Sequence, residues 1–137
     1  MIKIYYRKDC TSSQHVFHWF EKYPIDVRRQ HINTITRNDI IKLLQYSDEG
    51  LTDILKSPRK SKSKVRQELQ DMEHLSLNEA LDFIVSHPYV LSTPIIMDDN
   101  KMLIGYNPDQ IRIFLPAEYR RSTLFRKERE EVLKRGD

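Results

Sequence analysis

The 137-residue sequence has little cysteine and little glycine, with one of the former and three of the latter. The single cysteine, Cys10, excludes a disulfide within the chain and suits a reducing compartment. No run approaches the roughly 20 apolar residues that a membrane-spanning helix needs. The first residues alternate like a strand and lack the longer apolar segment of a signal peptide. We therefore expect a cytoplasmic protein that does not associate with membranes.

The sequence has little net charge, with a formal value of +3. Its basic residues are nevertheless unevenly distributed along the chain. Between residues 56 and 66 the chain has no acidic residue. The basic residues of this run are Lys56, Arg59, Lys60, Lys62, Lys64 and Arg66. Such a run can neutralise phosphates and hold nucleic acid, or it can be a solvated loop.

The N-terminal part of the chain predicts a strand, a helix and a second strand. Apolar residues alternate over 2–6, which is typical of a strand. Apolar side chains then recur at helical spacing, and Thr11 or Ser12 can cap the helix that contains them. Pro24 ends this helix, and alternation resumes over 25–28. A strand–helix–strand unit of about 30 residues favours a parallel pair with a right-handed crossover.

The middle of the chain shows helical patterns and no strand pattern. A helix begins near Thr36, and Gly50 is well placed to end it in a left-handed C-terminal cap. Helical spacing then returns twice, and Ser76 with Glu79 can form a capping box at the start of the second of these helices. These patterns predict an all-helical insertion over about residues 35–87.

Strand patterns return toward the C-terminal end. A short apolar strand is entered through Pro94, and a polar turn leads to a return strand over 102–104, which predicts an antiparallel hairpin. A further helix is expected around Ile111, and the charged segment after Pro116 can form a docked helix.

The order of these elements, β-α-β, helical insertion, β-β-α, predicts an α/β protein with a thioredoxin-like mixed sheet and an inserted helical subdomain. The chain is long enough for one hydrophobic core. We expect a single domain over 1–137, with its thioredoxin-like core in about 1–34 and 88–137 and its helical insertion in about 35–87.

Three segments carry a resemblance to a known family. They are Tyr5 to Ser13, which holds Cys10 in the redox-loop position; Ser47 to Gly50; and Pro94 to Asp98 together with Gly105 to Pro116. In this order they resemble the arsenate-reductase-like family and, within it, the Spx transcriptional regulators. The resemblance runs over about the first 120 residues.

The resemblance implies a regulator that binds the C-terminal domain of the RNA polymerase α subunit. The contact would centre on Gly50, with Ser47, Asp48 and Glu49 beside it. A residue without Cβ lets a partner's backbone come close, although a plain helix stop also explains a glycine here.

The resemblance further implies that DNA is contacted only through the polymerase complex. The candidate anion or DNA contacts of this chain are Arg59, Lys60, Lys62 and Lys64. The resemblance also suggests the protease ClpXP as a partner. Residues 134–137 are a charged tail, however, and such a protease favours small apolar C-terminal ends.

Cys10 is the candidate redox-active thiol. A thiol at a helix N-terminus has a lowered pKa, and Arg7 and Lys8 would add to that effect; an inert, partly buried cysteine is the alternative. Ser13 stands where Spx-like regulators commonly carry a second, resolving cysteine. The intramolecular disulfide switch is therefore absent, and Cys10 is either unswitched or responds by sulfenylation or a mixed disulfide.

Arsenate reductases of this family hold their anion with arginines, and this chain departs from that pattern. Thr93 and Tyr106 occupy two of the three arginine positions, and only Arg59 lies near the third. Arsenate reduction is therefore disfavoured. Pro94 is the cis-proline candidate of a thioredoxin-like fold, or else an ordinary proline at a strand entry.

No cofactor and no metal site are expected. His15 and His18 lie near one helix face and can join Cys10, but a fourth ligand has no obvious source. The leading hypothesis is a non-enzymatic regulator that binds polymerase. The alternative is a monothiol oxidoreductase of the arsenate-reductase type that uses Cys10 with glutathione or a glutaredoxin.

Overall fold

The computed structural model describes residues 1–117. The predicted docked helix after Pro116 and the charged tail at 134–137 lie outside the described residues, apart from Pro116 and Ala117 themselves. Residues 1–106 form one compact unit, and the described residues from Asn107 to Ala117 belong to another. No helix within residues 1–117 combines the length and the apolar character that crossing a bilayer requires.

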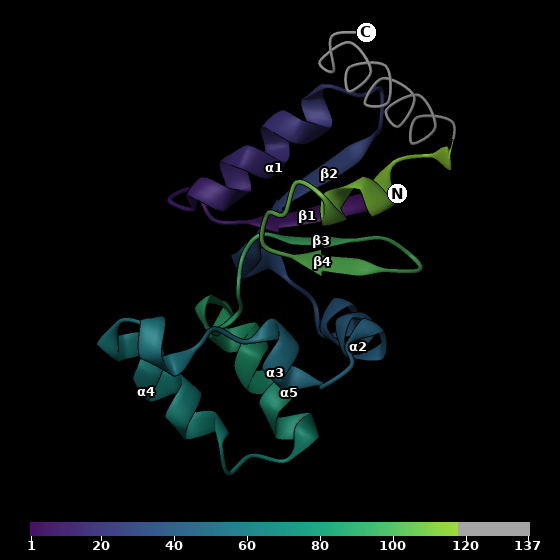
Figure 1. Ribbon diagram of the computed structural model, residues 1–137. Helices are drawn as coiled ribbons and strands as arrows, with labels where there is room; N and C mark the ends of the chain where they lie inside the picture. The colour runs from purple at the N-terminus through teal and green to yellow at the C-terminus, as the bar shows by residue number, and fades with distance from the viewer. Residues whose placement is uncertain (118–137) are drawn as a thin grey trace, which may run out of the picture. The chain divides into compact units, whose positions relative to one another are not determined.

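The first unit is built on a mixed sheet of four strands in the order β2-β1-β3-β4 (Figure 1). The strands are β1 (Ile2–Tyr6), β2 (Val27–His31), β3 (Ile95–Met97) and β4 (Met102–Ile104). β1 runs parallel to β2 and antiparallel to β3, and β3 runs antiparallel to β4. The predicted fold class, with its parallel pair and its hairpin, is confirmed.

The second strand begins two residues later than predicted, at Val27 rather than at Ile25. A tight turn explains the difference, because the backbone N–H of Ile25 donates to the carbonyl of Tyr23 at 2.8 Å. The chain therefore leaves the first helix through a turn around Pro24 before it extends.

Helix α1 (Thr11–Glu21) follows β1 and buries its apolar residues, among them Val16 and Phe20. The prediction that Thr11 or Ser12 caps this helix is wrong. The N-cap is Cys10, whose backbone is extended and whose side chain makes no capping hydrogen bond. The helix begins one or two residues earlier than these caps predict, at Thr11, so both hydroxyl side chains already lie in its first turn.

The predicted all-helical insertion is present. Its helices are α2 (Arg37–Tyr46), α3 (Leu51–Ile54), α4 (Ser63–Met72) and α5 (Leu77–Ser86). Thr36 caps α2 by accepting the N–H of Asp39 at 3.1 Å. The capping box of Ser76 and Glu79 forms at the start of α5 as predicted.

The predicted role of Gly50 as the left-handed cap of α2 is wrong. The helix ends earlier, and the N–H of Ser47 already bonds the carbonyl of Leu44 at 3.3 Å. Gly50 instead precedes α3, with φ of 74° and ψ of −137°.

The helix expected around Ile111 is a 3-10 helix, Gln110–Phe114. The proline at 116 explains why it stays short, because the residue before a proline is driven into the extended region. Leu115 accordingly has φ of −76° and ψ of 136°.

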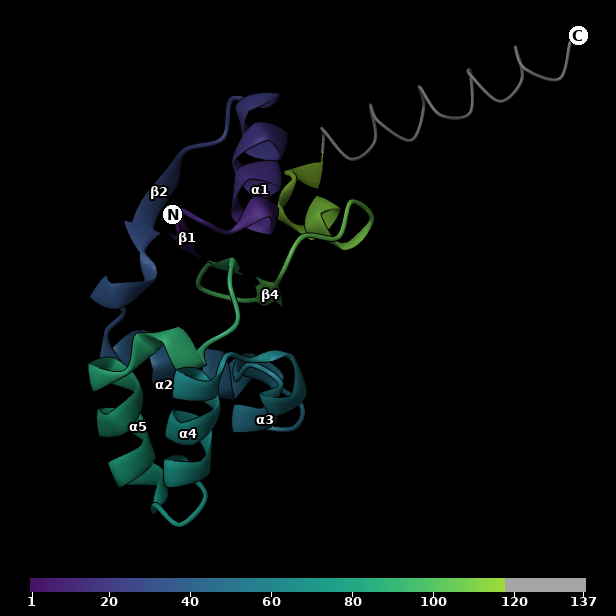
Figure 2. The same cartoon turned by 90° about the vertical axis from the view of Figure 1, so that its left-hand side faces the viewer.

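Helix α1 and the helical insertion lie on opposite sides of the sheet (Figure 1, Figure 2). Side chains alternate between the two faces of a strand. On β1 and β3 this places Ile4 with Ile96 on one face and Tyr5 with Ile95 on the other. Tyr5 and Ile95 belong to the same buried cluster as the insertion's apolar residues, such as Ile40. The insertion is therefore packed onto the sheet rather than tethered beside it.

Candidate functional site

Cys10 lies in the turn between β1 and α1. Its backbone N–H donates to the carbonyl of Arg7 at 3.2 Å, and its half-buried Sγ lies 3.7 Å from the carbonyl oxygen of Thr93, to which it donates. The Thr93–Pro94 peptide bond is cis. The contact with Thr93 shows that the thiol faces the segment that leads into β3.

The pKa of Cys10 lies below its usual value. Burial alone would raise it, but the side chains of Ser13 and Thr93 and the backbone N–H groups of Ser13 and Ser12 outweigh that effect. Ser13 is completely buried, and its Oγ has no hydrogen bond of ordinary geometry within residues 1–117. Its hydroxyl is therefore free to turn toward the sulfur, which stabilises the thiolate.

Replacing Ser13 with alanine is expected to raise the pKa of Cys10, because the thiolate loses a donor. At neutral pH the rate of alkylation by iodoacetamide should then fall by about three- to tenfold. Ser12→Ala is the matched control, since only the backbone N–H of Ser12 contributes and alanine keeps it. The rate measured across pH checks the shift; equal profiles for the two variants would contradict it.

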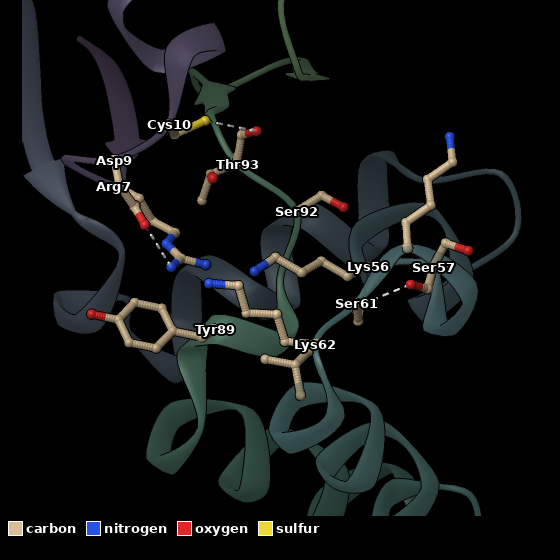
Figure 3. A pocket seen from close by; sticks show the side chains of 12 residues that line it. Arg7, Asp9, Cys10, Lys56, Ser57, Ser61, Lys62, Tyr89, Ser92 and Thr93 are labelled. Atoms are coloured by element: carbon tan, nitrogen blue, oxygen red, sulfur yellow. Dashed lines mark hydrogen bonds and ion pairs between the residues drawn. The ribbon is translucent and has the colours of Figure 1, made fainter.

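A cavity of about 510 Å³ opens beside the thiol (Figure 3). Its walls come from the loop after β1, from the segment between α3 and α4, and from the residues before β3. The lining residues are Arg7, Asp9, Cys10, Lys56, Ser57, Lys60, Ser61, Lys62, Val65, Tyr89, Ser92 and Thr93. The cavity therefore joins the thioredoxin-like core to the helical insertion.

The structure brings part of the predicted basic set to this cavity. All four residues are exposed, but only Lys60 and Lys62 of this set line the cavity. Lys56 also lines the cavity and was not predicted as a site residue, although it lies in the basic run. Burial and the charge of Arg7 lower the pKa of the Lys56 ammonium. The basic run indicates a candidate anion site, but the sequence does not show which of its side chains line the cavity.

Two further lining residues, Tyr89 and Ser92, carry no sequence signal. The Arg7 guanidinium lies over the ring of Tyr89, 4.4 Å from its centroid, and also pairs with Asp9 at 3.2 Å. These contacts hold Arg7 at the edge of the cavity. Lys8 is exposed and does not line it.

Tyr106 and the two histidines of α1 are the remaining residues considered from the sequence. The ring of Tyr106, at a lost arginine position, packs against His15 with 5.5 Å between centroids. Within residues 1–117 no group of three metal-ligating side chains gathers around His15, His18 and Cys10 or elsewhere.

The segment Ser47–Gly50 forms a second candidate site, on the insertion. The Asp53 carboxylate accepts the backbone N–H groups of Asp48 and Glu49 at 3.0 Å each. The Ser47 hydroxyl accepts the N–H of Gly50 at 3.1 Å and donates to the Leu44 carbonyl at 2.8 Å. This bonding fixes the turn, while the side chains of Asp48 and Glu49 remain exposed.

Gly50 has a backbone conformation that favours glycine. A Cβ built on it would meet nothing within 4 Å, so the space beside it is open. Its positive φ disfavours any other residue all the same. The glycine is thus required by the backbone and leaves an unobstructed surface.

An apolar groove of about 390 Å³ begins next to Gly50, at Leu51. Its lining residues are Leu51, Leu55, Leu69, Met72, Glu73, Leu75, Leu77 and Ala80. Leu77 is 59% exposed, so part of its apolar surface faces solvent at this groove.

The sequence matches a known protein family over most of its length. Residues 5–114 match the ArsC family. The chain belongs to the ArsC family, in its Spx-like branch. It is 35% identical over 127 residues to the global transcriptional regulator Spx of Streptococcus mutans, which covers 90% of each chain. It is 36% identical over 127 residues to the global transcriptional regulator Spx 1 of Lactococcus lactis, covering 90% of this chain and 96% of that one.

Solved structures of proteins described as arsenate reductases share the fold. An arsenate reductase from Vibrio cholerae superposes with a TM-score of 0.67 at 19% identity, covering 83% of this chain and 97% of that one. A possible arsenate reductase from Streptococcus mutans superposes with a TM-score of 0.65 at 21% identity, covering 81% and 97%. These likenesses concern the fold.

Proposed function

We propose that this protein is a transcriptional regulator that binds the C-terminal domain of the RNA polymerase α subunit through its helical insertion. The observation that carries the proposal is its identity of about a third, over nearly the whole chain, to proteins named global transcriptional regulators. DNA contact is secondary in this proposal and occurs through the polymerase complex.

The surface around Gly50 supports this docking mode. The glycine leaves open space where a partner's backbone can approach, and the fixed turn presents Asp48 and Glu49 to solvent. Exposed carboxylates of this kind steer a basic partner and make its association salt-dependent. The apolar groove that starts at Leu51 adds contact area.

The proposed regulator works without an intramolecular disulfide switch. Cys10 is the sole cysteine of the sequence, and Ser13 occupies the position of a resolving thiol. A serine hydroxyl can stabilise a thiolate but cannot form a disulfide with it.

A calorimetric titration with the isolated α-subunit domain tests the proposal. Wild-type protein is expected to bind, and Asp48→Lys is expected to weaken binding about tenfold at low salt through charge reversal. Asp26→Lys makes the same charge change at an exposed position outside the insertion and should bind like wild type. Absence of wild-type binding at low salt would refute the proposal.

The lowered pKa of Cys10 favours a second candidate, a monothiol oxidoreductase. Turnover of a disulfide substrate that Cys10→Ser abolishes would support the enzyme. Binding to the α-subunit domain that survives Cys10→Ser would support the regulator.

A further inference from the structure

The cavity beside Cys10 contains more cationic groups than the docking proposal uses. The side chains of Arg7, Lys56 and Lys62 reach into the same space from two different parts of the fold (Figure 3). Arg7 comes from the loop after β1, whereas both lysines come from the segment between α3 and α4. Such convergence does not arise from a solvated charge run, whose side chains would spread apart.

Within residues 1–117, no acidic partner neutralises the two lysines of this cluster. Asp9 is the acidic residue among those that line the cavity, and Arg7 already pairs with it. Among residues 1–117, no carboxylate lies within ion-pair distance of Lys56 or Lys62. Lys56 is moreover partly buried, which costs desolvation energy that an anionic ligand would offset. The cavity is therefore suited to a negatively charged molecule.

The thiol at its edge is prepared to react. Ser13 is completely buried beside it, with an Oγ that has no other partner among the described residues. A buried hydroxyl without a partner is costly, and the thiolate form of Cys10 satisfies it. A reactive thiolate and a binding site for an anion therefore lie in the same cavity.

We propose that Cys10 is a site of S-thiolation that selects small disulfides bearing carboxylates. The Cys10 thiolate attacks one sulfur of such a disulfide. A bond forms between Sγ and that sulfur as the original S–S bond breaks, and the other half leaves as a thiolate that takes a proton from water. The Cys10 sulfur is oxidised to the disulfide level, and the departing sulfur is reduced. Lys56 and Lys62 bind the carboxylates of the incoming disulfide.

The reaction stops at the mixed disulfide. Cys10 is the sole cysteine of the sequence, so no second thiol of the chain can displace the adduct. The bound group then occupies a cavity walled by both the core and the insertion. It is released only when an external thiol attacks it.

Three disulfides that differ in charge test the proposal on the full, reduced chain. Dithiodipropionate is anionic, hydroxyethyl disulfide is neutral and cystamine is cationic. The rate of adduct formation on Cys10 is followed by mass spectrometry at neutral pH and low salt. Comparing each reagent between wild type and a variant cancels the reactivity of its own leaving group.

The informative variant is Lys56→Gln/Lys62→Gln. It should slow dithiodipropionate about tenfold, leave hydroxyethyl disulfide within about twofold, and accelerate cystamine severalfold. Arg59→Gln/Lys64→Gln removes the same charge from exposed positions outside the cavity and should change all three rates little. Thermal melts check that both variants fold.

Equal rate changes for the three reagents would overturn the proposal, as would equal effects of the two double variants. The assay contains no polymerase, so its failure is distinct from a failure of the docking proposal. Conversely, loss of α-domain binding would leave the charge selectivity of Cys10 unaffected.

Discussion

Gly50→Arg is expected to abolish detectable binding to the α-subunit domain, a loss of roughly a hundredfold or more in affinity. The new side chain starts in open space, because no atom of the described residues beyond the chain neighbours lies within 4 Å of a Cβ at this position. It would instead project into the space that the partner must enter. The measurement is a calorimetric titration of wild type and variant side by side.

This substitution also strains the backbone, since Gly50 has φ of 74°. Gly105→Arg is the matched control: Gly105 has φ of 82° and an equally open Cβ position, but it follows β4 instead of lying in the insertion. Both variants should lose about 1–2 kcal/mol of stability. Binding lost only in Gly50→Arg assigns the effect to the interface; binding lost equally in both would assign it to strain.

Asp39→Ala is expected to lower the free energy of unfolding by about 3 kcal/mol. Asp39 lies in α2 and is only 4% exposed; its carboxylate accepts hydrogen bonds from Tyr5 and, at 2.9 Å, from Lys3. These contacts join β1 to the insertion. Its removal takes away the acceptor of the buried Tyr5 hydroxyl's proton. Urea unfolding measures the loss.

Two variants bracket this prediction. Tyr5→Phe removes only the hydroxyl and should cost about 1 kcal/mol. Asp48→Ala removes an exposed carboxylate that makes no ion pair within residues 1–117, and should cost almost nothing. A loss in Asp39→Ala no larger than in Asp48→Ala would show that the network does not stabilise the fold.

The same network predicts a pH dependence. Burial alone would raise the pKa of Asp39, but hydrogen bonds from Tyr5 and Lys3 outweigh it and hold the pKa below its usual value. A carboxyl whose pKa is lower in the folded state stabilises the fold above its unfolded pKa. That stability is lost as pH falls through the folded pKa. Asp39→Ala should therefore flatten the acid side of the stability profile.

Local patterns predicted the elements of the fold because each was marked by residues close in sequence. The capping box of Ser76 and Glu79 is an example, since both partners lie within one turn. A prediction was wrong where one residue type is compatible with two structural roles. Gly50 suits a helix end as well as a helix beginning, and only the early end of α2 at Ser47 decides between them.

The thiol site was predicted only in part, for a different reason. Cys10 and Ser13 are neighbours on one helix, so their relation follows from spacing. Lys56 reaches the same cavity because the insertion packs on the sheet, and Tyr89 does so from the segment just after the insertion. No local pattern encodes a meeting between residues so far apart in the chain.

Helix α1 begins at a cysteine that gives it no side-chain cap. Its first turn therefore relies on the charge of the sulfur, and the two are linked thermodynamically: a fold that favours the thiolate is itself favoured by it. The benefit is complete above the unfolded thiol's pKa and disappears as pH falls through the folded value. Any modification that neutralises the sulfur removes this stabilisation at every pH. The chemical state of one sulfur atom therefore contributes to the stability of the N-terminal turn of α1.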